Sequence, residues 1–294
     1  VKKVGLKPLA IHFDNGWNSE LAVKNIENIV KKLDIDLFTY VMNWEEFRDL
    51  QLSFLKASVP DCEIPTDHGI TATLLKKATE EGIKYIISGT NHSTEGILPF
   101  HYSYGVADWR YIKGVHKQFG LLPLKTFPHF SFLGRLYYIF VRKLKNIGLL
   151  NYIDYNKEQA MEVIQKELGW KYYGGKHYES IYTRFYQGYI LSEKFKIDKR
   201  RAHFSSLICS GQMTREQALE DLKKHPYGDE NLMRDDKEFV IKKFGLTPAE
   251  FEKIWQRPAK RFTDYPSYYP FLKKTRGLVR WAKSVGLLPK RVGI

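Results

Sequence analysis

ITATLLKKATEEGIKYIISGTNHSTEG, residues 70–96, contains a helix pattern, a strand pattern and a polar loop in direct succession. The helix pattern ends at Gly82, and glycine is common just after a helix. The short β-rich run KYIISG predicts a strand. The loop after it, SGTNHSTEG, is rich in small hydrogen-bonding residues. Such a loop either caps the next helix or binds a ligand through its backbone, and the sequence leaves both interpretations open.

Strand and helix patterns also alternate before this stretch. A helix end at 1–5 precedes a strand and the turn Asp14-Asn15-Gly16, and a helix at 19–33 precedes a strand at 35–43. This order predicts an α/β fold with a parallel Rossmann-like sheet, in which ligands bind at the carboxyl ends of the strands. Because the chain opens on the end of a helix, we expect an earlier segment upstream of Val1.

Helical patterns dominate after residue 125. We therefore predict an α/β domain at 1–125 and a mainly helical region at 126–294, which ends in a basic amphipathic helix and tail. Capping boxes mark two helix starts, at Thr214 and Thr247. The apolar stretch 130–153 is interrupted by basic residues, so it contains no uncharged apolar run of about 18 residues, the length that a membrane span needs. We expect it to be an amphipathic helix, with an anionic membrane surface as the alternative location.

Composition limits the class of protein. The 47 Lys and Arg exceed the 33 Asp and Glu, giving a formal charge of +14. This charge favours anionic partners, or is only a solvated basic surface. Cys62 and Cys209 lie far apart with no CxxC pair, so neither a disulfide framework nor a self-contained zinc site is predicted. A reducing cytoplasm fits this cysteine usage.

Several long segments, in one order, resemble the N-acetyl sugar amidotransferases of bacterial surface-polysaccharide biosynthesis. The resemblance extends to about residue 270 and rests on LKPLAIHFDNGWNSELAVKNIENIVKKL, NWEEFRDLQLSFLKASVPDCEIPTDHGI, KYIISGTNHSTEGILP, YESIYTRFYQGYIL, DKRRAHFSSLICSGQMTREQAL and DYPSYYPFL. It implies the PP-loop ATP pyrophosphatase fold, a five-stranded parallel sheet of the adenine nucleotide alpha hydrolase type. Its SGGxDS loop does not occur in these residues. We expect that loop, with a cysteine pair, in the upstream segment.

The resemblance implies a reaction and its partners. The acetamido group of a nucleotide-linked 2,3-diacetamido uronic acid becomes acetamidino, in lipopolysaccharide or O-antigen biosynthesis. ATP, with Mg²⁺, activates the amide oxygen as an AMP leaving group, and ammonia from a glutaminase subunit replaces it. A cyclase-like subunit is the other expected partner. We expect a cytoplasmic enzyme with no transmembrane segment and no nucleic-acid partner.

The resemblance also suggests roles for individual residues. ATP binding falls to the loops after the strands, with phosphate-neutralising lysines beyond them: Asp14, Asn15, Gly16, Gly89, Thr90, Asn91, Lys113 and Lys125. The pattern GTNHSTEG followed by YGVAD is similar to that of NAD synthetase, and it gives Glu95 a catalytic, Mg²⁺-binding role and Asp108 a weaker one. Surface charge and helix capping are the alternative roles for these residues.

Other residues are candidates for catalysis or substrate binding. Asp67 either caps a helix or binds ligand, and His68 is a candidate general base for ammonia attack. Arginines can bind a uronate carboxylate or a diphosphate bidentately, and the candidates are Arg184, Arg200 and Arg201. Cys209 is a candidate Zn²⁺ ligand together with the upstream cysteines, or simply a buried apolar residue.

Two other functions fit the same features. A PP-loop tRNA-modifying enzyme would share the sheet and the basic charge, but no RNA-reading module or catalytic cysteine pair is visible. A non-catalytic relative that only holds a glutaminase would lack the SGGxDS loop. An upstream SGGxDS in the coding sequence would exclude this scaffold function.

Overall fold

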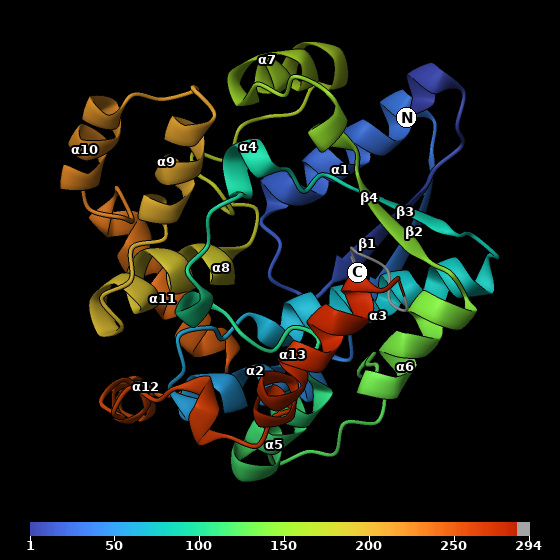
Figure 1. Ribbon diagram of the computed structural model, residues 1–294. Coiled ribbons are helices and arrows are strands. Elements are labelled where there is room, and N and C mark those ends of the chain that lie inside the picture. The colour runs from blue at the N-terminus through green and yellow to red at the C-terminus, as the bar shows by residue number, and fades with distance from the viewer. Residues whose placement is uncertain (287–294) are drawn as a thin grey trace.

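The computed structural model describes residues 1–286 and shows an α/β protein in which helices predominate (Figure 1). The α-helices are α1 (Glu20–Leu33), α2 (Trp44–Ala57), α3 (Ile64–Glu80), α4 (His92–Glu95), α5 (Trp109–Phe119), α6 (Phe132–Leu136), α7 (Lys157–Leu168), α8 (Ile181–Phe185), α9 (Arg200–Cys209), α10 (Arg215–Lys223), α11 (Glu230–Lys243), α12 (Pro248–Trp255) and α13 (Tyr269–Ser284). Two π-helices, η3 (Tyr137–Val141) and η5 (Tyr186–Lys194), continue α6 and α8. Four short 3₁₀ turns complete the helical elements: η1 (Lys2–Val4), η2 (Phe100–Tyr102), η4 (Leu149–Tyr152) and η6 (Phe262–Asp264).

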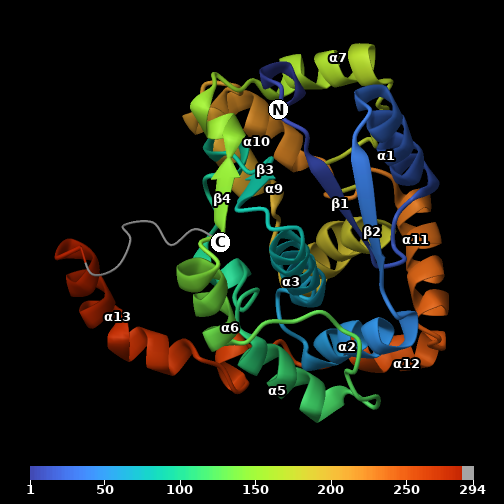
Figure 2. The same ribbon diagram turned by 90° about the vertical axis from the view of Figure 1, so that its right-hand side faces the viewer.

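The strands form two separate parallel pairs. β1 (Leu9–Asp14) pairs with β2 (Asp36–Val41), and β3 (Tyr85–Ser88) pairs with β4 (Lys145–Gly148). Helix α3 contacts both β1 and β3. In Figure 2 the two pairs stand apart on either side of α3. The predicted parallel strands are therefore present, but a single Rossmann-like sheet is not confirmed within the described residues.

Two sequence predictions of the elements were wrong. The stretch 130–153 is not one amphipathic helix, because it is divided into α6, η3, β4 and η4, and the short strand β4 pairs with β3. Helix α3 begins at Ile64, six residues earlier than predicted, because Pro65 fits the first turn of a helix. Asp67 consequently lies inside the first turn of α3 and not at its N-cap.

Predictions based on helix termini were more accurate. Thr214 and Thr247 both form capping boxes, with Gln217 and Glu250 as the reciprocal partners. Gly5 and Gly82 follow helical segments with φ of 79° and 66°, a left-handed conformation that favours glycine. The predicted C-terminal amphipathic helix is α13, and the tail beyond residue 286 lies outside the described residues.

One hydrophobic core joins the first 125 residues to the helical region. Trp17, which follows β1, is 1% exposed and lies 5.1 Å from the Tyr182 ring and 5.2 Å from the Phe244 ring. Its indole nitrogen donates to Gln51 on α2 at 2.7 Å. Burial of such large aromatic side chains supplies much of the hydrophobic stabilisation of a domain. The loop after β1 is thus held by α2, α8 and α11.

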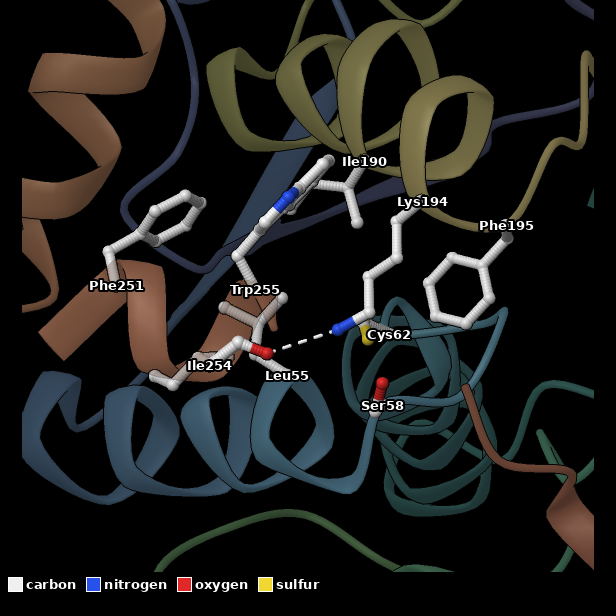
Figure 3. Close-up of a pocket in the computed structure, with 9 residues that line it drawn as sticks. All are labelled: Leu55, Ser58, Cys62, Ile190, Lys194, Phe195, Phe251, Ile254 and Trp255. Atoms are coloured by element: carbon white, nitrogen blue, oxygen red, sulfur yellow. Dashed lines mark hydrogen bonds between the residues drawn. The ribbon is translucent and has the colours of Figure 1, made fainter. Parts of the chain in front are cut away.

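A small enclosed cavity marks where the helical region packs on α2 (Figure 3). Its volume of about 20 Å³ has room for about one water molecule. Lys194 donates to the backbone carbonyl of Ile254 at 3.0 Å, at the end of α12. Burial raises the pKa of the neighbouring Cys62 thiol, which keeps it protonated and unreactive. The contact between Lys194 and Ile254 is structural.

No described helix is long and apolar enough to cross a membrane.

Candidate functional site

A cavity of about 310 Å³ adjoins the carboxyl end of β3. Three parts of the chain surround it: the loop at 89–95, the segment 155–179, which includes α7, and the first two turns of α9. The residues that decide its chemistry are Gly89, Glu95, Trp170, Tyr173, Lys176 and His203. Its size lies at the lower end of the range for small-molecule sites. The cavity therefore joins the polar loop quoted from the sequence to the helical region.

The loop after β3 is held rigidly. Asn91 caps α4 by accepting from the Thr94 amide at 2.8 Å, so its side chain is used in the fold. Asn151 accepts from the His92 amide at 2.8 Å, and Ser206 on α9 accepts from the Ile97 amide at 3.1 Å. The Thr90 hydroxyl bonds to that of Ser88 at 2.8 Å. The side chains of Asn91 and Thr90 are thus used in internal hydrogen bonds of the loop.

Gly89 is the open position of this loop. A Cβ at Gly89 would meet no atom within 4 Å. Gly148 on the neighbouring strand differs, because a Cβ there would lie 2.9 Å from the Thr90 carbonyl oxygen. Gly148 is therefore required by packing, whereas the space beside Gly89 is free for a ligand.

Three charged or titratable side chains form a chain across the cavity. The Lys176 ammonium lies 3.1 Å from the Glu95 carboxylate and 3.0 Å from Nδ1 of His203. Burial, with the nearby Lys176 charge, lowers the pKa of His203 to about 3, so the imidazole is neutral near pH 7. Burial also lowers the pKa of Lys176. Lys176 thus donates to both neighbours, and its third N–H can reach an anionic ligand.

Aromatic rings form another wall of the cavity. Trp170 lies 6.1 Å from the Tyr172 ring and 5.3 Å, edge-on, from the Tyr173 ring. The Tyr172 side chain is 48% exposed, although large aromatic residues usually bury most of their surface. Exposed aromatic faces beside a hydrogen-bonding cation can bind a ring-shaped polar molecule with apolar C–H faces. A sugar is such a molecule.

A second polar group lies at the start of α3. Asp67 keeps solvent access, yet desolvation and the carboxylates of Asp61 and Glu63 raise its pKa to about 8. Lys199, just before α9, partly offsets the rise at Asp67 and also acts on His203. Among the predicted catalytic residues, Asp67 has the pKa that is shifted furthest from its ordinary value.

The predicted ATP-binding turn after β1 is held by internal bonds. Asp14 accepts from the Gly16 amide at 2.9 Å, and Asn15 accepts from the Trp17 amide at 3.2 Å. Lys243 of α11 donates to the Gly16 carbonyl and lies over the Trp17 ring at 4.9 Å. Gly16 has a φ of 77°, which explains the glycine there. The turn is preformed, and its role in binding ATP stays a prediction.

Two predicted site residues have structural roles. His68 is fully buried, with Nδ1 2.6 Å from the Val106 carbonyl and Nε2 accepting from the Phe130 amide, and burial lowers its pKa to about 4. Asp108 is 5% exposed and caps α5 by accepting from the Tyr111 amide. Its other oxygen accepts from Tyr104 and from the Tyr268 amide, each at 2.7 Å. Neither side chain has a free position for substrate or metal.

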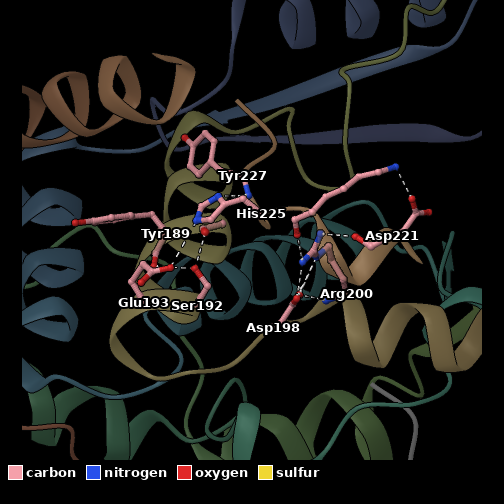
Figure 4. A network of polar contacts seen from close by, with 10 residues as sticks. Tyr189, Ser192, Glu193, Asp198, Arg200, Asp221, His225 and Tyr227 are labelled. Atoms are coloured by element: carbon pink, nitrogen blue, oxygen red, sulfur yellow. Dashed lines mark hydrogen bonds and ion pairs between the residues drawn. The ribbon is translucent and has the colours of Figure 1, made fainter. Parts of the chain in front are cut away.

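Two of the predicted arginines are bound by carboxylates of the protein. Arg184 makes bonds of 2.6 and 2.7 Å to Asp236, which also accepts from Tyr227. Arg200 pairs with Asp198 and donates to the backbone carbonyls of residues 221 and 224 (Figure 4). Both pairs fix the helical region. Arg201 is exposed on α9, and its substrate-binding role stays a prediction.

The remaining predicted residues lie apart from the cavity. Lys113 is exposed on α5, and the Lys125 amide donates to Glu46 at 3.0 Å. Cys209 is an exposed free thiol, and Cys62 is buried. In residues 1–286, no group of three or more His, Cys, Asp or Glu is arranged to hold a metal ion. The described residues alone therefore do not fit a complete Mg²⁺ or Zn²⁺ site.

Sequence reasoning missed the most important side chains of the cavity. Lys176, Trp170 and Tyr173 fall in GWKYYGGKHYE, residues 169–179, where aromatic, glycine and basic residues alternate. That composition is the signal that could have identified the segment. His203 lies two residues after Arg201, and no local feature of the sequence marks it as a site residue. Its contact with Lys176 spans 27 residues, a pairing that no local pattern predicts.

Comparison with known families identifies the class of the C-terminal region. Residues 179–276 match a domain of lipopolysaccharide-biosynthesis proteins. The matching family model is described as LPS biosynthesis protein WbpG-like, C-terminal domain. The match supports the resemblance to the lipopolysaccharide and O-antigen amidotransferases, and it includes His203, Arg184 and Arg200. No curated protein matches the chain.

Proposed function

We propose that this chain forms the main body of an ATP-dependent N-acetyl sugar amidotransferase of lipopolysaccharide biosynthesis, and that the cavity beside Gly89 binds the acidic sugar. The observation that supports this most directly is that two independent signals meet there. The GTNHSTEG loop supplies Gly89 and Glu95, and the WbpG-like region supplies His203.

The cavity suits a diacetamido uronic acid. Its aromatic wall can contact the sugar ring, and the Lys176 ammonium can bind the uronate carboxylate by a charge-assisted hydrogen bond. Because Nδ1 of the neutral His203 imidazole accepts from Lys176, its Nε2 carries the proton and can donate a hydrogen bond on the other side of the ring. Glu95 keeps the ammonium oriented in the absence of substrate. These residues bind and orient the sugar, which supplies part of the rate acceleration.

The strand arrangement supports a nucleotide site nearby. Each inner strand, β1 and β3, is paired on one side only, and Ile87 on β3 is 41% exposed. Parallel sheets are normally covered on both faces and paired at inner edges. We propose that one more strand lies between β1 and β3, giving a five-stranded parallel sheet. The loop after that strand would then lie between Gly16 and Gly89, where ATP would supply the AMP leaving group.

The acidic group at the start of α3, which includes Asp67, would serve the second half of the reaction, the attack of ammonia. Because the pKa of Asp67 is about 8, its protonated and ionised forms differ little in free energy near neutral pH. Such a carboxyl group can take a proton from the incoming ammonia. Asp67 is the residue we propose for this step. The proposal also includes ATP and Mg²⁺ as cofactors, and a glutaminase and a cyclase-like subunit as partners.

The test is an activity assay on the full-length protein as the cell makes it. The nucleotide-linked diacetamido uronic acid, ATP, Mg²⁺ and an ammonium salt are incubated with the protein, and AMP and the product mass are followed. We expect AMP to form together with a product in which NH replaces one amide oxygen. Sugar binding without AMP formation would favour the scaffold function, and AMP formation with tRNA alone would favour the tRNA-modifying one.

A further inference from the structure

Helix α13, Tyr269–Ser284, presents large apolar side chains to solvent. Phe271, Leu278 and Trp281 are 56%, 64% and 56% exposed. Figure 2 shows α13 extending away from the body of the molecule. Single exposed apolar residues are ordinary, but several on one projecting helix indicate an interaction surface.

The charge of this end of the chain selects the partner. Residues 269–294 include seven basic residues and no Asp or Glu, so they hold half of the formal charge of +14. The exposed cations of α13 are Lys273, Lys274, Arg276 and Arg280. None of these four side chains takes part in an ion pair with another described side chain. A basic surface with interspersed apolar side chains matches a surface that is both anionic and apolar.

A second segment of the same character lies beside the start of α13. The Phe132 ring at the start of α6 is 5.6 Å from the Tyr268 ring. Leu133 and Val141, in α6 and its π-helical continuation, are 73% and 64% exposed. Both figures show α6 on the same side of the molecule as α13. The exposed apolar surface thus extends over two elements.

We propose that α13 binds the surface of an anionic lipid membrane, with Trp281 and Leu278 inserted at the level of the headgroups. Helix α13 is short and charged, so it lies in the interface and does not span the bilayer. Trp is well suited to this depth because its ring is apolar and its N–H is polar. Anionic lipid is favoured over a second copy of the chain, since two helices with the same high positive charge repel each other. This inference does not depend on the proposed reaction.

The experiment is co-sedimentation of the purified protein with vesicles of phosphatidylcholine, with and without phosphatidylglycerol. We expect binding to the anionic vesicles only, weakened by high salt, and a blue shift of tryptophan emission that Trp281→Phe removes. The triple variant Lys273→Glu, Lys274→Glu, Arg276→Glu should weaken binding at least about a hundredfold, because each basic residue near the surface contributes roughly fivefold and the new carboxylates are repelled by the anionic lipid.

A matched variant controls for net charge. Arg215→Glu, Lys242→Glu and Lys253→Glu change the charge equally at exposed positions of α10, α11 and α12, and should have a much smaller effect. Circular dichroism and thermal unfolding verify that both triple variants fold. Equal binding to both kinds of vesicle, or equal loss in the two triple variants, would overturn the proposal. Self-association through α13 without lipid binding would also overturn the proposal. The same holds if RNA binding requires α13 and vesicle binding does not.

Discussion

The arginine pairs of the helical region and the lysine of the cavity differ in how fully they are bound. Arg184 makes two bonds of 2.6 and 2.7 Å to Asp236, and both side chains are largely buried, at 13% and 7% exposure. Lys176 makes single contacts of 3.1 Å to Glu95 and 3.0 Å to His203, beside a cavity. The first arrangement leaves no position for a ligand and stabilises the fold. The second leaves one N–H free and can bind an anion.

The largest expected effect is on stability, from breaking the buried pair. Arg184→Met leaves Asp236 buried without its cation, which should lower the free energy of unfolding by about 3–5 kcal/mol. Urea denaturation followed by circular dichroism measures this change. The exposed pair Lys24–Glu27 is the control, and Lys24→Met should cause no measurable change. Similar results for the two variants would show that the Arg184 pair does not stabilise the fold.

Removing the charge at the cavity should affect binding and leave stability nearly intact. Lys176→Met deletes the proposed carboxylate partner, and the loss of one charge-assisted hydrogen bond should weaken sugar binding roughly ten- to a hundredfold. Titration calorimetry with the nucleotide-linked diacetamido uronic acid measures the affinity. Lys171→Met is the matched control, because Lys171 is exposed, lies five residues away and does not line the cavity. Unchanged affinity in Lys176→Met would remove the cavity from the proposal.

The neutral state of His203 predicts a pH dependence of stability. Burial lowers its pKa from 6.5 to about 3, so the folded protein binds fewer protons than the unfolded chain between these values. The free energy of unfolding should therefore fall as the pH decreases below about 6.5, by about 1 kcal/mol per pH unit from this group. In His203→Gln this contribution is absent, so its slope should be shallower. Parallel pH profiles for the two proteins would contradict a neutral His203.

The smallest expected effect on stability comes from substituting Gly89, and it is compared with the same substitution at Gly148 on an adjacent segment. Gly89→Ala places a methyl group in free space, so unfolding should be unchanged within about 0.5 kcal/mol while sugar affinity falls. Gly148→Ala forces its Cβ against the Thr90 carbonyl and should destabilise the protein. Thermal unfolding and calorimetry on both variants distinguish these outcomes. If Gly89→Ala bound sugar normally, the space beside Gly89 would not be part of the site.

The sequence predicted what depends on local patterns. Spacing and capping chemistry were enough to predict the strands that precede the polar loops. They were also enough to predict the capping boxes and the helical character after residue 125. Strand β4 was missed because its four residues follow an apolar stretch that also suits a helix. His68 and Asp108 are polar residues beside loops, and only the fold shows that their partners are internal.

The cavity itself depends on contacts distant in the sequence. Glu95, Lys176 and His203 come from three segments, and their distances are set by how α9 packs on the loop after β3. No local pattern encodes that packing. The sequence could indicate Glu95 because it lies in the quoted loop. It could not indicate that a lysine 81 residues later is its partner.

Hydrogen–deuterium exchange of the protein, with and without the nucleotide-linked diacetamido uronic acid, tests the central claim most directly. The cavity beside Gly89 predicts protection of peptides covering residues 86–97, 170–179 and 200–209. A larger aromatic cavity of about 570 Å³, lined by residues of 59–61, 100–104 and 259–263, is the rival site. Protection of those segments, with none around Lys176 and His203, would contradict the account.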